Sequence, residues 1–569
     1  MEEAVSFPDE SQSFQGCKKH LLCDAGRKSS GLLKIRNSGN PMPRMKMVQT
    51  LLIIWFFGVA AQGNLFAAAP DDLLASSRFV GGTALANNTS ASKLKAIWAL
   101  PETREFQSNV LHKAASLSAS FLGGNASDEK QGGLLRPLLD DLLGAESIAE
   151  LRGTTPANAE LYLAVQLKED RARLWETNLL QAAKAKAKPA KIDDASGWQT
   201  KIGQREKFLH FYRAGKWTVL VIGQEQAPAR ADFLKRLRAA AAPRSWLEAD
   251  LDLPRLKMLL PEIDAMPVKL ARAQFQIIGQ GENLRTTARI IYPEKIDWKP
   301  DAWNIPKNTI RDPLISFTAG RRLAPFFKPW QPADQLGFNP LTNQIYFWAQ
   351  SQMPFQSYFA LPVKEATNVL KVLAPKLAKT FNPVLEKRNG GMLNISSNQT
   401  EVLWQNLPPI IVPFLRPAKE TNGMELLLGG LFPLVPSTNV PPAELFAQVT
   451  GSSNLVFYDW EITEARLSQA RFVSQLLPFF SAETVKTNAN GTKRYSMPWM
   501  PQEKWLMAIG PKLGNTVTEI TFKGPNELNV VRKSHLGLNS SELIFLSHWL
   551  ATKTFPPRSP FVPAIPSPK

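Results

Sequence analysis

The pattern of apolar and polar residues predicts strands, hairpins and amphipathic helices along most of the chain. Apolar residues three and four positions apart over 134–151 predict a helix, and the preceding segment from about residue 64 has the same helical character. A strand is predicted at 159–167. A helix follows it directly, in which Leu174, Trp175 and Asn178 share one face with Leu179 and Ala182.

Three hairpins are the clearest local predictions. The runs 208–213 and 217–223 flank Gly215, and the segment 269–292 turns at Gly281; glycine favours the positive φ that such turns need. The third hairpin covers 515–534. Between the first two hairpins, 228–240 reads as an amphipathic helix with Phe233, Leu234 and Leu237 inward.

Two segments interrupt this pattern. The Ala/Lys run KAKAKPAK at 184–191 is predicted to be a solvated helix end and linker. The segment 293–313 contains four prolines in 21 residues, which disfavours both helix and central strand, so we predict the main domain boundary near residue 300. Beyond it, strands are predicted at 345–350 and 355–361 before a helix at 363–378, and a strand at 454–462 before a helix at 464–477.

Two stretches of the chain resemble each other. AVQLKEDRARLWETNLL (164–180) and YDWEITEARLSQARFV (458–473) each run from a strand into an acidic helix start, Ala-Arg-Leu and apolar positions at helical spacing. We therefore predict an α+β fold of two related halves, each a mainly antiparallel or mixed sheet with hairpins, backed by helices. The halves are placed at 70–295 and 305–555, and the Pro-rich segment at 556–569 is predicted to be an extended tail whose PxxP spacings reflect its composition.

An export signal is predicted inside the sequence. Arg44 and Lys46 precede an apolar run at 51–61, which small and polar residues follow, so residues 45–63 form a signal peptide cut after Ala61 or Gly63. The alternative is an uncut single-span anchor at 48–69. Both put the bulk of the chain outside the cytoplasm. Residues 1–44 are then either upstream of the true start or a disordered extension.

Cysteine usage and charge agree with an exported protein. Cys17 and Cys23 both precede the signal, which excludes disulfides, thiol catalysis and a Cys zinc site from the exported chain and favours a bacterial periplasmic or extracellular protein. Residues 1–61 hold 8 Lys/Arg and 5 Asp/Glu, so their removal lowers the net charge from +18 to +15. Outside the cytoplasm this points away from nucleic acid and toward an anionic envelope polymer or lipid surface, or to solubility alone.

The standard catalytic motifs are missing. There is no Gly-x-Ser-x-Gly elbow, no phosphate loop and no His-Glu-x-x-His. The Ser-x-x-Lys at Ser90–Lys93 lacks an apolar helix behind it and a Lys-Thr-Gly partner. His210 alternates within a strand and reads as a packed or surface residue. No catalytic residue, metal site or cofactor is therefore assigned.

Two clusters are candidates for binding. Asp459, Trp460 and Glu461 end a strand, and carboxylates two residues apart there share one face; alternatively they face solvent and favour the N-terminus of the next helix. Arg532, Lys533, Ser534 and His535 precede a helix start at 539–542 and could hold an anion; alternatively they are a strand end before an ordinary N-cap.

A family resemblance adds a little to these expectations. NLVFYDWEITEARLSQ and KLGNTVTEITFKGPNELNVVRKSHLGLNSSELIFLSHWL resemble large exported proteins of environmental bacteria whose function is unknown. The resemblance covers most of 70–555. It implies an export signal and two α/β halves, and it transfers no catalytic residue.

Three functions remain open. The first is a non-enzymatic envelope protein that binds or scaffolds an anionic component. The second is a periplasmic hydrolase whose residues, with Asp459, Glu461, Ser534 and His535 the first to test, assemble in one deep pocket. The third is a membrane-anchored assembly factor that keeps residues 48–69. The sequence leaves the oligomeric state open.

Overall fold

The computed structural model describes most of the chain beyond residue 71. The described residues are 72–122, 129–184, 186–192, 195–202, 207–226, 229–266, 268–327, 343–351, 356–387, 391–406, 412–434, 437–476, 485–487, 493–495 and 502–551. The N-terminal extension, the signal segment and the Pro-rich tail lie outside these residues, so the statements about them stay predictions. No helix among the described residues is long and apolar enough to cross a membrane.

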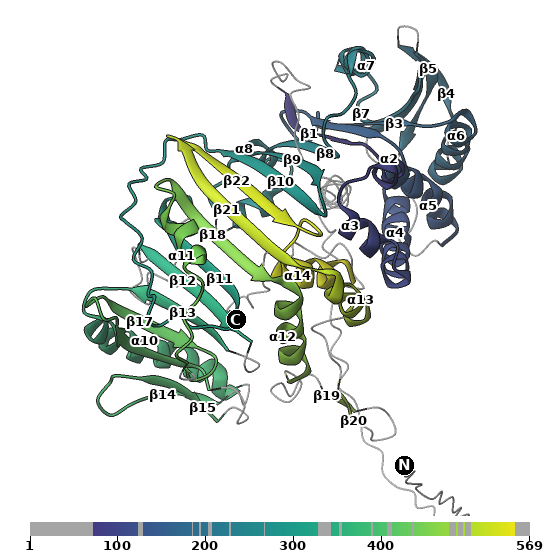
Figure 1. Ribbon diagram of the computed structural model, residues 1–569. Helices are drawn as coiled ribbons and strands as arrows, with labels where there is room; N and C mark the ends of the chain where they lie inside the picture. The colour runs from purple at the N-terminus through teal and green to yellow at the C-terminus, as the bar shows by residue number, and fades with distance from the viewer. Residues whose placement is uncertain are drawn as a thin grey trace, which may run out of the picture. The chain divides into compact units, whose positions relative to one another are not determined.

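The fold is α+β and is organised around one antiparallel sheet of 20 strands (Figure 1). From one edge to the other the strands are β4 (Lys188–Ile192), β5 (Ala195–Ile202), β6 (Lys207–Ala214), β7 (Trp217–Gly223), β3 (Glu160–Gln166), β2 (Ser147–Arg152), β1 (Leu73–Phe79), β8 (Leu247–Asp252), β9 (Arg272–Gln280), β10 (Asn283–Ile291), β22 (Glu527–Ser534), β21 (Asn515–Gly524), β18 (Leu455–Ile462), β11 (Leu314–Arg321), β12 (Gln344–Gln350), β13 (Ser357–Pro362), β17 (Glu425–Gly430), β16 (Phe414–Lys419), β15 (Val402–Gln405) and β14 (Met392–Ile395). A separate two-stranded sheet pairs β19 (Val485–Thr487) with β20 (Lys493–Tyr495).

The chain follows the same path on both sides of the sheet's middle. Counted from the outer edge inward, the order is β4-β5-β6-β7-β3-β2-β1-β8-β9-β10 on one side and β14-β15-β16-β17-β13-β12-β11-β18-β21-β22 on the other. The two series meet where β10 pairs with β22 in antiparallel register. The Pro-rich segment at 293–313 connects β10 to β11, but the sheet continues across that connection, and the described residues belong to one compact unit.

Helices and short 3-10 turns cover the sheet. The helices are α2 (Gly82–Asn87), α3 (Ser92–Trp98), α4 (Pro101–Phe121), α5 (Glu129–Gly144), α6 (Glu169–Ala183), α7 (Ala229–Ala239), α8 (Leu253–Leu256), α10 (Ala366–Lys387), α11 (Ala443–Thr450), α12 (Thr463–Leu476), α13 (Glu503–Ile509) and α14 (Ser540–Ala551). The 3-10 turns are η1 (Pro261–Ala265), η2 (Ala324–Phe326) and η5 (Gly510–Lys512).

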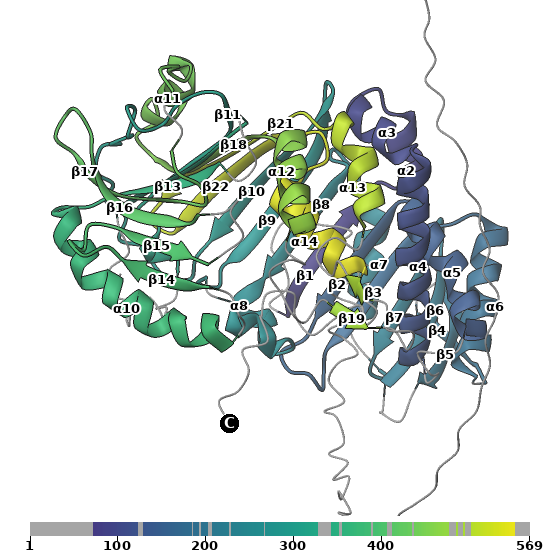
Figure 2. The same cartoon turned by 90° about the horizontal axis from the view of Figure 1, so that it is seen from below.

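The two sheet faces can be named from residues that point to them. Residues directly opposite each other in antiparallel strands point to the same face, and neighbours along a strand point to opposite faces. One face, here called the Asp459 face, carries the hydrophobic clusters of α4 to α6 and of α10. The other, the Lys533 face, carries the clusters of α7 and α11. Figure 2 shows α10 and α11 on opposite sides of the same strands.

Helices that are far apart in the sequence also hold the two series of strands together. The Trp505 ring of α13 stacks on Phe106 of α4 with ring centroids 4.4 Å apart. Its indole N–H donates to Thr103 Oγ1 at 3.1 Å, and Lys504 Nζ lies 2.7 Å from Glu105 Oε2. The Lys113 ammonium of α4 donates to the Ala551 carbonyl at the end of α14 at 2.9 Å. The C-terminal helices therefore pack on an N-terminal helix.

All three predicted hairpins are confirmed. They are β6–β7, β9–β10 and β21–β22, and Gly215 and Gly281 in the first two turns both have φ 58°. Local alternation and a permissive turn residue are enough to specify such pairs because both strands are close in sequence.

Three local predictions were wrong. The helix predicted over 134–151 ends at Gly144, and Ser147–Arg152 forms strand β2. Residues Leu73–Phe79, in a stretch predicted to be helical, form strand β1 in the interior of the sheet. The KAKAKPAK run contains edge strand β4, where lysine and proline are typical because they discourage further pairing.

Candidate functional site

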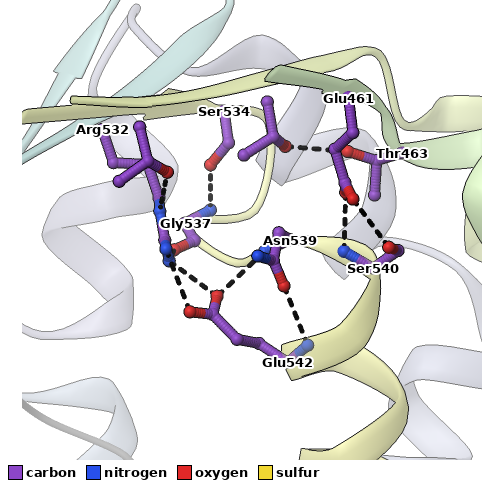
Figure 3. Close-up of polar contacts among 10 residues, drawn as sticks. Glu461, Thr463, Arg532, Ser534, Gly537, Asn539, Ser540 and Glu542 are labelled. Atoms are coloured by element: carbon purple, nitrogen blue, oxygen red, sulfur yellow. Dashed lines mark hydrogen bonds and ion pairs between the residues drawn. The ribbon is translucent and has the colours of Figure 1, made fainter. Parts of the chain in front are cut away.

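The two candidate clusters lie on strands β18 and β22, with β21 between them. Asp459 pairs with Thr518, and Thr518 pairs with Arg532 on the next strand. Glu461 pairs with Thr516 in the neighbouring row, and β11 adds Thr318 opposite Asp459. The structure thus brings Asp459, Glu461, Arg532 and Ser534 together as a polar strip on one face of the sheet. Figure 3 shows Glu461, Arg532 and Ser534 beside the start of α14.

Glu461 fastens the start of α14 to the sheet. Its side chain is buried, and its two carboxylate oxygens accept the Ser540 backbone N–H and the Ser540 hydroxyl, each at 2.7 Å. Burial raises the pKa of Glu461, while the Ser540 hydrogen bonds oppose that shift. A carboxylate at a helix N-terminus is favoured because the free N–H groups and the helix dipole both attract negative charge. The helix it serves is α14, and not α12, which follows Glu461 in the sequence.

Asp459 lies one row away on the same face. Its Oδ1 accepts the Thr318 hydroxyl at 2.6 Å. Burial raises the pKa of Asp459, and the Thr318 hydrogen bond and the charge of Arg532 oppose the shift. The alternative that these two carboxylates simply face solvent is therefore wrong, since Glu461 is buried and Asp459 is only partly exposed.

Arg532 is held by several protein groups at once. Its guanidinium donates to both oxygens of Glu542, at 2.6 and 2.9 Å, which is the bidentate geometry of strong arginine–carboxylate pairs. It also donates from Nε to Thr518 Oγ1 at 2.9 Å and from Nη1 to the Gly537 carbonyl at 3.1 Å. The cation is thus engaged within the protein.

A capping box starts α14. The Glu542 N–H donates to Asn539 Oδ1 at 2.9 Å, and the Asn539 N–H donates to Glu542 Oε2 at 3.0 Å. This reciprocal pair is the one that Asn-x-x-Glu predicts at a helix start. Ser534 accepts the Gly537 N–H at 2.7 Å and fixes the preceding turn. These contacts are those of a strand end followed by the N-cap of a helix, which was the alternative to an anion site for this segment.

The other three candidate residues have different surroundings. Trp460 points to the Lys533 face and packs against the core cluster of α11. Lys533 is exposed on that same face. His535 lies just beyond β22, with Nδ1 2.9 Å from the Gly514 N–H that donates to it. The predicted clusters are therefore divided between two faces of one sheet.

The polar strip on the Asp459 face has the contacts expected of residues that stabilise the packing of α14 on the sheet. Asp459, Glu461, Arg532 and Ser534 each have a short hydrogen bond to a protein partner. Polar groups that are buried or partly buried and have hydrogen-bond partners fix the position of an element, here α14 on the sheet. A surface hollow between α12 and α13 is lined by residues such as Leu467, Arg471 and Met507 and includes none of these four.

Some members of the strip were not predicted. Thr318, Thr518 and Ser540 carry no motif of their own, because they become partners only through strand pairing and helix docking. The Asn539-x-x-Glu542 pattern is a signal that the sequence does contain. No group of three or more His, Cys, Asp or Glu able to hold a metal occurs within the described ranges.

His210 is a packed residue, which is one of the two alternatives that the sequence left open. It is fully buried in β6, and its Nε2 lies 2.9 Å from the Gln224 carbonyl oxygen. Tyr212 Oη and Arg230 Nη1 each lie 3.4 Å from Nδ1. Burial, followed by the Arg230 charge, lowers the pKa of His210 to about 4.

No family model matches this chain, and no curated protein and no solved structure matches it either.

Proposed function

We propose that this protein is an exported, non-enzymatic protein of the bacterial envelope that binds or scaffolds an anionic component. The observation that carries the proposal is that the candidate charged side chains are already hydrogen-bonded within the protein. Glu461 accepts two hydrogen bonds from Ser540, and Arg532 donates two to Glu542. A general acid or base needs a proton-transfer path to substrate. Side chains engaged in this way serve the fold, so the remaining basic surface becomes the functional candidate.

Charge and the export signal support the same proposal. Without residues 1–61, which hold 8 Lys/Arg and 5 Asp/Glu, the net charge of +18 becomes +15, and the signal pattern at 45–63 would place the folded part outside the cytoplasm. Anionic polymers and lipids are the abundant partners of a basic protein there.

Two experiments test the proposal. The N-terminal sequence and intact mass of the native protein, measured on fractionated cells, distinguish a start near Gln62 or Asn64 in the soluble fraction from an uncut anchor in the membrane. The purified native protein is then tested for binding to anionic vesicles, lipopolysaccharide and an acidic polysaccharide, each beside a neutral counterpart. We expect binding to an anionic partner that weakens as salt rises. Equal binding to neutral and anionic partners would contradict the proposal.

A hydrolase is the second candidate, and the raised pKa values of Asp459 and Glu461 favour it. Perturbed carboxylates often occur at active sites. Arg466 of α12 adds to this environment: burial lowers its pKa, and the charges of Glu461 and Asp459 oppose that change. Hydrolysis of an envelope polymer that is lost in Asp459→Asn but kept in Thr318→Val would favour the enzyme over the scaffold.

We further propose that the two halves, 70–295 and 305–555, arose from one repeated unit. The repeated strand order supports this. The two sequence segments that resemble each other form β3–α6 and β18–α12. They do not occupy equivalent places in the repeated order, because β3 corresponds to β13 and not to β18. Strand-to-helix units converge easily, so their similarity is a weaker argument than the strand order.

A further inference from the structure

Two cations face each other at the middle of the sheet. Arg285 of β10 and Lys533 of β22 are direct cross-strand partners, so their side chains leave the Lys533 face side by side. They occupy the junction at which the two series of strands meet. Like charges directly opposite in antiparallel strands destabilise the pair, so this arrangement needs a reason.

Neither cation has an ion-pair partner among the described residues. Arg289 lies four residues further along β10 on the same face and does have such a partner. Its guanidinium donates to both oxygens of Glu527 at 2.9 Å. No equivalent carboxylate lies opposite Arg285, whose other cross-strand neighbour is Ile278. Lys533 is flanked by Val517. Two positive charges without an ion pair therefore lie next to each other on one face, and the nearest carboxylate in the pairing pattern, Glu519, is diagonal to Lys533 and opposite Val531.

The surrounding face lies between two helices. A row of direct cross-strand partners runs from Ile148 in the cluster of α7 to Tyr458 in the cluster of α11, so both helices stand on this face. The row is Ile148, Arg78, Glu248, Gln276, Thr287, Val531, Glu519 and Tyr458. Between the helices, Thr287, Val531 and Arg285 are partly exposed and Lys533 is exposed. The central strands thus offer an accessible strip with a helix at each end.

We propose that Arg285 and Lys533 are the anion-binding centre of this protein, and that the occupant is a strand of acidic polysaccharide lying across β9, β10, β22 and β21. The proposal rests on the proposed binding of an anionic envelope component and names its site and ligand class. A bound carboxylate or similar anion relieves the repulsion between the two cations and gains charge-assisted hydrogen bonds.

The shape of the face favours a polymer strand over a bilayer. A bilayer is a flat surface, and α7 and α11 stand above the strip on the same face at its two ends, so they hold a membrane away from it. An extended polymer can lie between them. The row through the two cations continues to Val517 and then to Trp460, which packs against the cluster of α11 and marks that end of the strip. At about 4.8 Å per strand, the row from Ile278 to Trp460 spans roughly 19 Å.

The test compares two double variants of the native full-length protein that lose the same charge. Arg285→Gln with Lys533→Gln removes the proposed centre. Lys371→Gln with Lys379→Gln removes two exposed lysines of α10, which packs on the opposite face. Binding of polygalacturonate, with neutral dextran as reference, is measured by titration calorimetry. We expect the first variant to lose about tenfold in affinity, the scale of one lost charged hydrogen bond, and the second to bind like wild type.

Each outcome has a separate meaning. If wild type binds no anionic partner, the proposed function fails together with the site. If wild type binds polygalacturonate and the two variants lose affinity equally, or only the α10 variant loses it, the function stands and this site is wrong. If anionic vesicles, and not polygalacturonate, depend on Arg285 and Lys533, the ligand class is wrong. If the first variant instead abolishes self-association seen by sedimentation, the face joins two copies and the proposal is overturned.

Discussion

His210 shows how one buried ring makes the fold sensitive to acid. The imidazole is fully buried beside Arg230, whose Nη1 lies 3.4 Å from Nδ1. A proton on this ring would place a second positive charge next to the guanidinium in a poorly solvated site. The pKa of His210 is therefore about 4 in the folded protein, against an ordinary value of 6.5.

The direction of the pH effect follows from that shift. Between pH 6.5 and 4 the unfolded chain binds a proton at this position and the folded chain does not, so the free energy of unfolding falls as the pH falls. We expect the contribution to be about 2 to 3 kcal/mol between pH 7 and 4.5, and to vanish in His210→Gln. Urea unfolding of both proteins at the two pH values measures it. An unchanged pH slope in the variant would show that other groups cause the acid sensitivity.

Among the candidate residues, the sequence predicted their shared face but not their partners. Asp459 and Glu461 are two positions apart in a strand, which is sufficient for them to point the same way. Their partners, Thr318 and Ser540, lie 141 and 79 residues away in sequence. No local pattern contains that information, because those contacts exist only after the strands have paired and α14 has docked.

At the scale of elements, Ser540 makes two of the hydrogen bonds that hold α14 on the sheet. Ser540 gives both its N–H and its hydroxyl to buried Glu461, whereas the next residue, Ser541, is exposed. Ser540→Ala removes the hydroxyl donor and leaves one oxygen of a buried carboxylate without that partner. We expect a loss of about 1 to 3 kcal/mol in the free energy of unfolding, measured in urea. Ser541→Ala is the matched control. An equal effect of the two substitutions would show that the hydrogen bonds between Ser540 and Glu461 do not stabilise the docking of α14.

A side chain of α10 covers part of the free edge of the outer strand β14. Asn382 of α10 accepts the Leu393 N–H at 2.7 Å and donates to the Leu393 carbonyl at 3.1 Å, so its amide occupies both edge-facing groups of that residue. Unpaired edge groups are templates for pairing with another chain. At the opposite edge, β4 carries Pro189 with Lys188 and Lys191 instead.

Removing the amide should open this edge. We expect Asn382→Ala to associate at protein concentrations where wild type does not, because Leu393 then presents a free donor and acceptor. Sedimentation velocity over a concentration series measures the association. Asn394→Ala, a change on β14 itself that leaves the Leu393 contacts in place, is the control. If both variants sediment like wild type, Asn382 does not protect the edge.

Strand β1 shows why prediction from local sequence succeeded only in part. Strand β1 contains Ser76, Ser77 and Arg78, and all three are buried. Such a polar stretch does not read as an interior strand. It becomes one because β2 and β8 pair on its two sides and Arg78 meets Glu146, a residue 68 positions away in sequence. Tertiary pairing overrides local preference at such positions.

At the scale of the whole molecule, the packing of α13 on α4 should make the described unit unfold as one. Trp505 is buried against Phe106 and bonds Thr103, which joins the C-terminal helices to the N-terminal part. We expect Trp505→Ala to lower the free energy of unfolding by about 3 to 5 kcal/mol. The control is Trp98→Ala, because Trp98 is half exposed on α3.

Cooperativity is the second readout of this contact. Wild type should show coincident transitions in urea by tryptophan fluorescence and by far-UV circular dichroism. Loss of the interface in Trp505→Ala is expected to separate the two curves. If wild type already shows two separate transitions, the sheet and the helix contact do not couple the halves, and the single-unit description fails in solution.

The sequence by itself determined the parts of this protein whose partners are near in the chain. The hairpins β6–β7, β9–β10 and β21–β22 and the capping box of α14 follow from alternation, turn glycines and Asn-x-x-Glu spacing. Tertiary structure alone decided that β10 would join β22, that Glu461 would hold α14, and that Arg285 and Lys533 would stand together. Those outcomes depend on surfaces that only come into contact when distant segments pack, so no short stretch of the sequence contains them.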